Sequence, residues 1–112
     1  MKLKAPRHLG PAGRELWLEL QRAYGIDDAG GLELLNIAAE CRDRMANAQR
    51  AITEHGELIK MASGVLKANP AINIEKDART GLLAALRQLN LDVEPLKNVG
   101  RPGRAQGVTR AN

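Results

Sequence analysis

Two apolar stripes, separated by a short segment rich in turn residues, constrain residues 32–90 more than any other feature of the chain. The first stripe has small and apolar residues at heptad spacing: Leu34, Ala38, Cys41, Met45, Ala48 and Ile52. Such spacing favours a long helix with one apolar face, which Gly56 would end. The second stripe contains Ala78, Leu82, Ala85 and Leu89, and it follows Asn69-Pro70, a typical helix start. We therefore predict an antiparallel hairpin of two long helices.

The segment between the stripes, about residues 58–67, predicts a small β-hairpin at the bend, turning at Ser63-Gly64. A two-residue turn would pair Met61 with Leu66, Lys60 with Lys67 and Ile59 with Ala68. Ile59, Met61, Leu66 and Ala68 would then share one face, and the two lysines the other. Facing lysines are unfavourable, so either solvent screens them or an anion binds between them.

A lone two-stranded hairpin is marginal in water. The apolar face of this one therefore needs a partner, either the helices of the same chain or a neighbouring subunit. We predict Ile59, Met61 and Leu66, together with the first helical stripe, as oligomerisation residues.

The N-terminal part predicts a shorter helix that begins at Pro11, after an extended basic arm of residues 1–10. Pro11 suits the first helical turn, and Gly25 predicts a left-handed C-cap. Either Asp27 or Asp28 would cap the next helix. The apolar face of this short helix comprises Leu16, Trp17, Leu20, Ala23 and Tyr24.

Two details of the predicted long helices bear on packing. Glu75 precedes Arg79 by four residues, the favourable order for an ion pair on a helix. Gly81 lies inside the last helix, where glycine costs roughly 1 kcal/mol relative to alanine. It is either a tolerated weakness or a site where another helix approaches closely.

The composition indicates a thin core. The chain has 112 residues, enough for one domain, but contains no Phe, one Trp and one Tyr. Aromatic side chains usually supply much of a core's buried area, so the monomer should be marginally stable and gain from oligomerisation. The stripes would be buried against the helix that starts at Pro11 or against copies of the chain. We predict a mainly α, oligomeric assembly protein rather than an enzyme with a pocket.

Positive charge is concentrated at the two ends of the chain, whose net charge is +4. Residues 1–14 carry four Lys or Arg and no acid, whereas residues 15–90 are slightly acidic. Residues 92–112, rich in Pro and Gly, predict a flexible basic tail after a helical domain of residues 11–91. Basic ends suggest contact with a polyanion, although they could simply aid solubility. The candidate DNA-binding residues are Lys2, Lys4, Arg7, Arg14, Lys60, Lys67, Arg101, Arg104 and Arg110.

No motif commits the chain to catalysis, a cofactor or a metal. Gly30-Gly31 lacks the Lys-Ser/Thr of a phosphate-binding loop, and His8 and His55 lie on different predicted elements. Cys41 sits on the apolar stripe, which indicates a packed thiol rather than a nucleophile. No apolar run is long enough to span a bilayer and no secretion signal is visible, so we expect a cytoplasmic protein with no membrane contact.

The order of these features resembles the small terminase subunits of tailed bacteriophages, from about Leu9 to Leu91. The resemblance rests on Leu9-Gly10-Pro11 followed by Trp17, on Asp28 before a long helix, and on His55-Gly56 ahead of the ribbon. Its most specific segment runs from Gly64 to Asn69-Pro70, with a helix after it that closes at Leu89-Asn90-Leu91. The family's basic closing motif is looser here, with Leu96-Lys97-Asn98 after Pro95.

The resemblance implies a non-enzymatic DNA-packaging adaptor in the cytoplasm of a bacterial host. Family members form rings, bind double-stranded viral DNA and regulate a large subunit that carries the ATPase and nuclease. The alternative is a coiled-coil-like protein-interaction module without DNA binding of its own. A helix-turn-helix-like unit around residues 25–28 would be a poor reader of DNA, because its second helix opens with Asp27, Asp28 and Glu33.

Overall fold

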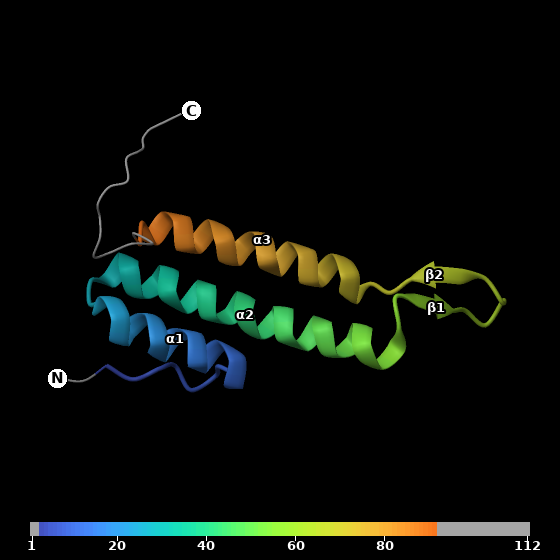
Figure 1. Ribbon diagram of the computed structural model, residues 1–112, viewed down its shortest axis with the longest axis horizontal. Coiled ribbons are helices and arrows are strands. Elements are labelled where there is room, and N and C mark those ends of the chain that lie inside the picture. Colours follow the sequence, from blue (N-terminus) through green and yellow to red (C-terminus); the bar gives the residue numbers. More distant parts are fainter. Residues whose placement is uncertain (1–2, 92–112) are drawn as a thin grey trace, which may run out of the picture.

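The computed structural model describes residues 3–91, which form three helices and a two-stranded ribbon. In chain order these are α1 (Pro11–Tyr24), α2 (Ala29–His55), β1 (Leu58–Lys60), β2 (Leu66–Ala68) and α3 (Ala71–Leu89). Helices α2 and α3 lie side by side and run antiparallel, α1 lies along the first half of α2, and the ribbon projects beyond the helices (Figure 1). The predicted mainly α hairpin with a β-hairpin at its bend is confirmed.

The helix ends follow local capping chemistry. Gly25 ends α1 in the left-handed conformation with φ 57°, as predicted. Asp28, rather than Asp27, caps α2, because its carboxylate accepts a 2.8 Å hydrogen bond from the backbone N–H of Gly31. Gly56 ends α2 through its N–H bond to the carbonyl of Ile52.

Asn69 holds the start of α3 and the end of α2 together. Its side-chain oxygen accepts from the N–H of Ala71 at 3.0 Å, and its amide nitrogen donates to the carbonyl of Gly56 at 2.9 Å. Pro70 already has helical angles, φ −56° and ψ −23°, as expected of a proline in a first turn. Asn69 is buried, so one polar side chain fixes both helix ends at the base of the ribbon.

The described residues form two apolar clusters on either side of α2. One lies between α2 and α3 and contains Ala38, Cys41, Met45, Ala78, Leu82 and Ala85. The other joins α2 to α1 and the N-terminal segment, and contains Ala5, Leu9, Trp17, Ile26, Leu35 and Ala39. Many of these residues are alanines, so the helices pack on small side chains and their backbones lie close.

Glycines mark the closest helix contacts. A Cβ atom at Gly81 would lie 3.0 Å from the Cys41 sulfur, so the close-approach interpretation of Gly81 is confirmed. Cys41 is buried and free of any disulfide, as expected of a packed thiol. At Gly13 a Cβ atom would lie 2.4 Å from the carbonyl oxygen of Ala39, a contact too short for any side chain.

The ribbon is shifted by one residue from the predicted register. Ile59 pairs with Lys67 and Lys60 pairs with Leu66, so Lys60 and Lys67 do not face each other. The loop contains three residues, 62–64, because Met61 bonds Val65 and the N–H of Gly64 bonds the Met61 carbonyl. Gly64 has φ 93°, and this three-residue loop with a glycine at positive φ is a common hairpin connection.

The shift by one residue changes which side chains of the two strands share a face, because successive residues of a strand point to opposite faces. Lys60 and Leu66 share one face with Leu58 and Ala68, whereas Ile59 and Lys67 share the other. The single apolar face predicted for Ile59, Met61, Leu66 and Ala68 is therefore wrong. Each face instead carries apolar side chains and one lysine.

The N-terminal segment does not extend away from the body. Ala5 and Leu9 are buried in the α1–α2 cluster, which ties residues 3–10 to the helices. Residues 3–10 of the predicted basic arm therefore lie against the helical body, because Ala5 and Leu9 are buried there. On α1, Trp17 is buried and Leu16, Leu20 and Tyr24 are half-buried, but Ala23 is exposed.

Candidate nucleic-acid and assembly surfaces

Asp43 of α2 holds the start of α1. Its two carboxylate oxygens accept hydrogen bonds from the backbone N–H groups of Gly10 and Gly13, each at 2.7 Å. Gly10 has no capping side chain of its own and the first turn of α1 has no acid. Asp43 therefore supplies both the missing cap and the negative charge that a helix N-terminus favours.

Two further polar contacts fasten the same region to α2. The indole N–H of Trp17 donates to the side-chain oxygen of Asn36 at 2.8 Å, and His8 lies 2.8 Å from a carboxylate oxygen of Glu40. The partners are 19 and 32 residues apart in sequence. No sequence pattern indicates these pairs, and the one local signal for a clamp here is the absence of a capping side chain at Gly10.

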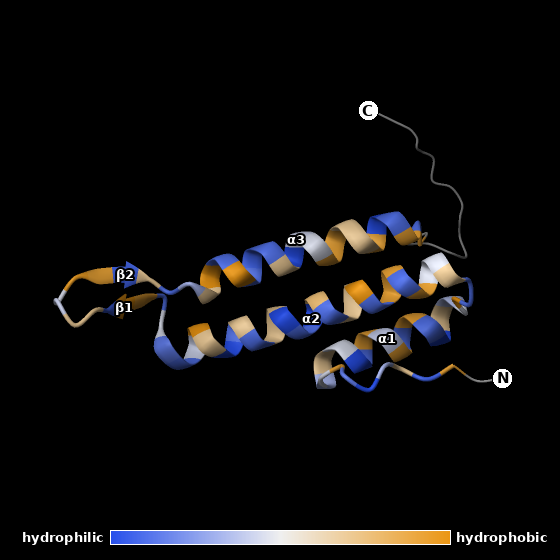
Figure 2. Cartoon of the chain, turned by 180° about the vertical axis from the view of Figure 1, so that it is seen from behind, coloured by the Kyte–Doolittle hydropathy of each residue, from blue (hydrophilic) through white to orange (hydrophobic). Residues whose placement is uncertain are grey.

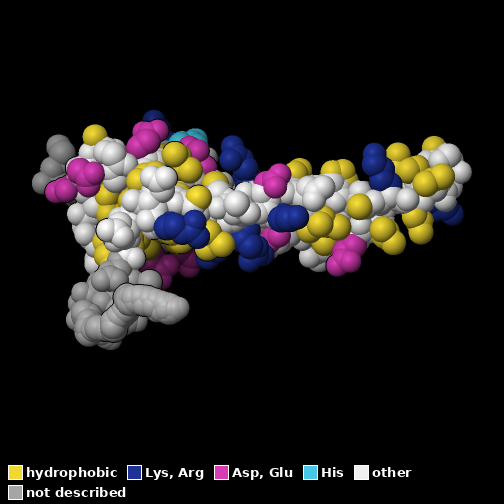
Figure 3. Space-filling view, turned by 90° about the horizontal axis from the view of Figure 1, so that it is seen from above, with side chains coloured by type: hydrophobic (Ala, Val, Ile, Leu, Met, Phe, Trp, Pro, Cys, Tyr) yellow, Lys and Arg dark blue, Asp and Glu magenta, His cyan; other side chains and the backbone are white. Residues whose placement is uncertain are grey.

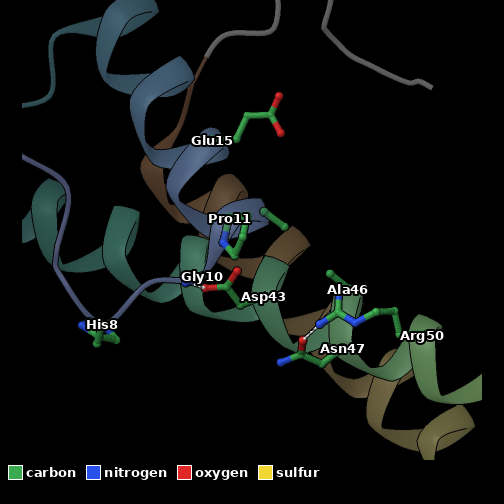
Figure 4. Close-up of a pocket in the computed structure, with 9 residues that line it drawn as sticks. His8, Gly10, Pro11, Glu15, Asp43, Ala46, Asn47 and Arg50 are labelled. Carbon is green, nitrogen blue, oxygen red and sulfur yellow. Dashed lines mark hydrogen bonds between the residues drawn. The ribbon is translucent and has the colours of Figure 1, made fainter.

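A surface hollow of about 500 Å³ opens beside the hydrogen bonds that Asp43 accepts from the start of α1. Figure 4 shows Asp43 bonded to Gly10, Arg50 bonded to Asn47, and Glu15 pointing away from both. Both carboxylate oxygens of Asp43 accept hydrogen bonds from backbone N–H groups, which indicates a structural role for this side chain. The hollow gives no support to a catalytic assignment.

The predicted DNA-binding residues do not form one patch. Lys4, Arg7 and Arg14 are exposed near the start of α1, whereas Lys60 and Lys67 are exposed on the ribbon at the other end of α2. A helix of 27 residues is about 40 Å long, which sets the scale of their separation. Lys2, Arg101, Arg104 and Arg110 lie outside the described residues.

The charge of the described body is nearly balanced. Residues 3–91 carry 12 Lys or Arg and 11 Asp or Glu. Most of the excess of +4 therefore belongs to residues 1–2 and 92–112. Because residues 3–91 have almost no net charge, they can attract a polyanion only where their cations are grouped on the surface.

The predicted oligomerisation residues occupy two different environments. Ala38, Cys41, Met45 and Ala48 are buried within one chain, and Leu34 and Ile52 are half-buried. Helix α3 covers the centre of this stripe, so these residues build the subunit itself. Ile59 is half-buried, but Met61 is 43% exposed and Leu66 is 60% exposed.

The ribbon is the most exposed apolar surface that the structure describes. Its strands pack mainly on each other, and apolar residues colour much of its length (Figure 2). In the space-filling view, apolar side chains gather at this projecting end with a few cationic side chains among them (Figure 3). Exposed apolar patches of this kind mark interaction sites.

Glu75 links α2 to α3 near the ribbon. Its carboxylate accepts hydrogen bonds from Arg79 on its own helix, as predicted, and from Gln49 of α2 at 3.1 Å. The Arg79 bond, then the Gln49 bond, lowers the pKa of Glu75 below its usual value. These contacts indicate a structural role for the carboxylate.

Other site chemistry is not indicated within residues 3–91. No group of three His, Cys, Asp or Glu side chains in this range is placed to hold a metal ion. None of the helices described here has the length and apolar character needed to cross a membrane.

Comparison with known protein families gives a match over most of the chain. The family model described as "Phage terminase, small subunit" matches residues 14–104, most of the chain. No curated protein and no solved structure matches.

Proposed function

The chain belongs to the phage terminase small-subunit family, and on this premise we propose that it is a non-enzymatic, oligomeric adaptor for DNA packaging. In this role it binds double-stranded viral DNA and regulates the large terminase subunit, which carries the ATPase and nuclease, in the host cytoplasm. The family match over residues 14–104 is the observation that carries the proposal. Because it covers most of α1 and all of α2, the ribbon and α3, it concerns most of the helical body.

The distribution of cations supports a contact with phosphates rather than with bases. Lys4, Arg7 and Arg14 are exposed on a segment that Asp43 and the buried Leu9 hold in place. Such side chains supply affinity without reading sequence. Helix α1 lies along α2 and the start of α2 is acidic (Figure 1), which argues against a recognition helix there.

Assembly would multiply these weak contacts. A subunit with nearly balanced charge in its body binds DNA weakly, but several linked subunits present several sets of cations to one duplex. The exposed apolar ribbon supports assembly, and a closed ring would use head-to-tail interfaces. We propose such a ring as the DNA-binding form.

The test combines mass and DNA binding for the full chain. Light scattering should give a mass of several chains, and fluorescence anisotropy should detect binding to duplex DNA at about 0.1 M salt. Neutralising Lys4, Arg7 and Arg14 together, or Arg101, Arg104 and Arg110 together, should weaken binding and flatten its salt dependence. Glutamine at three other exposed arginines, Arg22, Arg42 and Arg44, provides a control that removes the same number of charges.

The alternative is an interaction module that binds the large subunit but not DNA. The near balance of 12 cations and 11 acids in the described body favours it. An oligomer with no detectable affinity for duplex DNA at about 0.05 M salt, where phosphate contacts are strongest, would reject the DNA-binding proposal in its favour.

A further inference from the structure

The ribbon carries apolar side chains that its own chain leaves uncovered. Leu58, Val65 and Leu66 are each about 60% exposed, and the two strands pack mainly on each other. The register places Leu58 and Leu66 on one face. An antiparallel ribbon that served only as a surface loop would be expected to turn polar side chains to water on at least one face.

A groove between α1 and α3 lies at the opposite end of the molecule. Its walls are Leu20 and Tyr24 of α1 and Leu83, Leu86 and Arg87 of α3, with Leu91 at its end. It has a volume of about 500 Å³, whereas a cavity of about 150 Å³ accommodates a benzene ring. Leu83 is 53% exposed, so the groove has both the room and the apolar wall for aliphatic side chains.

The two ends have opposite charge. Residues 58–68 of the ribbon contain Lys60 and Lys67 and no acid. At the groove end, residues 19–33 contain four exposed acids, Glu19, Asp27, Asp28 and Glu33, against two cations, Arg22 in the same range and Arg87 in the groove wall. Contacts between like ends are therefore repulsive, and contacts between unlike ends are attractive.

We propose that the ribbon of one copy docks in the α1–α3 groove of a second copy, with Leu58 and Leu66 entering the groove. The proposal deepens the assembly part of the proposed function and rests on it. The contact joins two different surfaces of the same chain, so it can continue from copy to copy and close into a ring. Lys60 and Lys67 then lie beside the acidic end of the neighbour.

The test uses one charged substitution on each surface of the full chain. Leu66→Glu on the ribbon and Leu83→Glu in the groove should each weaken self-association by at least about 30-fold, the effect of a hot-spot residue. Ile37→Glu is the matched control, because Ile37 is 40% exposed but does not line the groove. Light scattering over a concentration series measures the association.

Mixing the two variants is the decisive measurement. The Leu66→Glu chain keeps an intact groove and the Leu83→Glu chain keeps an intact ribbon, so an equimolar mixture should form a complex with the mass of two chains. A mixture that remains monomeric overturns the proposal. So does a Leu83→Glu chain that assembles like wild type but melts at a lower temperature, because the groove would then be filled from within its own chain.

The outcome separates this proposal from the proposed function. Wild-type protein that is a monomer and does not bind duplex DNA refutes both. Wild-type protein that assembles and binds DNA, with Leu83→Glu assembling equally well, refutes only the pairing of ribbon and groove.

Discussion

The two ends of α2 are held in opposite ways. At its first half, α1 and the N-terminal segment are fixed by the two Asp43 bonds, by the Trp17–Asn36 bond and by close contact at Gly13. At the other end, a ribbon with strands of three residues is fixed to the helices chiefly through Asn69. The contacts that fasten α1 to α2 therefore lie at one end, and the apolar surface available to other chains lies at the other.

The substitution with the largest expected effect on stability is Gly13→Ala, at the contact between α1 and α2. The new Cβ atom would lie 2.4 Å from the carbonyl of Ala39, and a backbone atom cannot move aside without shifting a helix. We expect a loss of about 3 kcal/mol in the free energy of unfolding, the upper part of the overpacking range. Urea denaturation measures it.

The control for this substitution is Gly30→Ala in the first turn of α2. There the nearest atom to a new Cβ lies at 3.7 Å, so the change should be neutral or stabilise by up to about 1 kcal/mol. A loss for Gly13→Ala no larger than that for Gly30→Ala would contradict a close α1–α2 contact at Gly13.

Asn69→Ala tests the base of the ribbon. Removal of its side chain leaves the N–H of Ala71 and the carbonyl of Gly56 without their partner. The N–H of Ala71 is buried, and a buried donor is costly to leave unpaired. We expect a loss of about 2 kcal/mol. Asn69→Asp should restore the cap of α3 but not the bond to Gly56, and should fall between alanine and wild type in thermal unfolding.

Leu66→Ser on the ribbon should barely affect the stability of the monomer. Because Leu66 is 60% exposed and packs on no core, the change should stay within about 0.5 kcal/mol. The measurement requires protein dilute enough to be monomeric. A loss as large as that of Asn69→Ala would mean that the ribbon contributes to the subunit's own core.

The smallest expected effect concerns pH. The folded-state pKa of Glu75 is lowered by Arg79 and Gln49, so its stabilising contribution is present above the unfolded pKa and is lost as pH falls through the folded value. Glu75→Gln should lower the melting temperature slightly at pH 7 and not at pH 2–3. The effect is small because solvent screens the exposed Arg79. A difference that grows toward acid pH would contradict this assignment.

The helix ends and the buried helix face could be predicted from the sequence, because they depend on residues close together in the chain. Gly25, Asp28 and Gly56 act over one helical turn, and the heptad spacing of Ala38, Cys41 and Met45 identifies the face that α3 covers. The fold class therefore followed from local patterns. The centre of the predicted oligomerisation stripe is buried by α3 of the same chain, and the role of the stripe in oligomerisation stays a prediction.

Long-range pairs were not predictable in the same way. Asp43 bonds Gly10 and Gly13 across 33 and 30 residues, and no periodicity links these positions. Ser63-Gly64 is compatible with a two-residue or a three-residue loop, and the backbone of Gly64 at φ 93° belongs to the longer one. The buried positions of Ala5 and Leu9 were likewise missed, because isolated apolar residues among cations carry no pattern.

The length of the loop at residues 62–64 has a consequence for sequence change. An insertion or deletion of one residue there exchanges the surfaces on which Leu58, Leu66 and the two lysines lie, yet it leaves every helix and its packing untouched. A small edit at the tip could thus redirect which neighbours a subunit accepts, while its fold and its melting temperature stay the same.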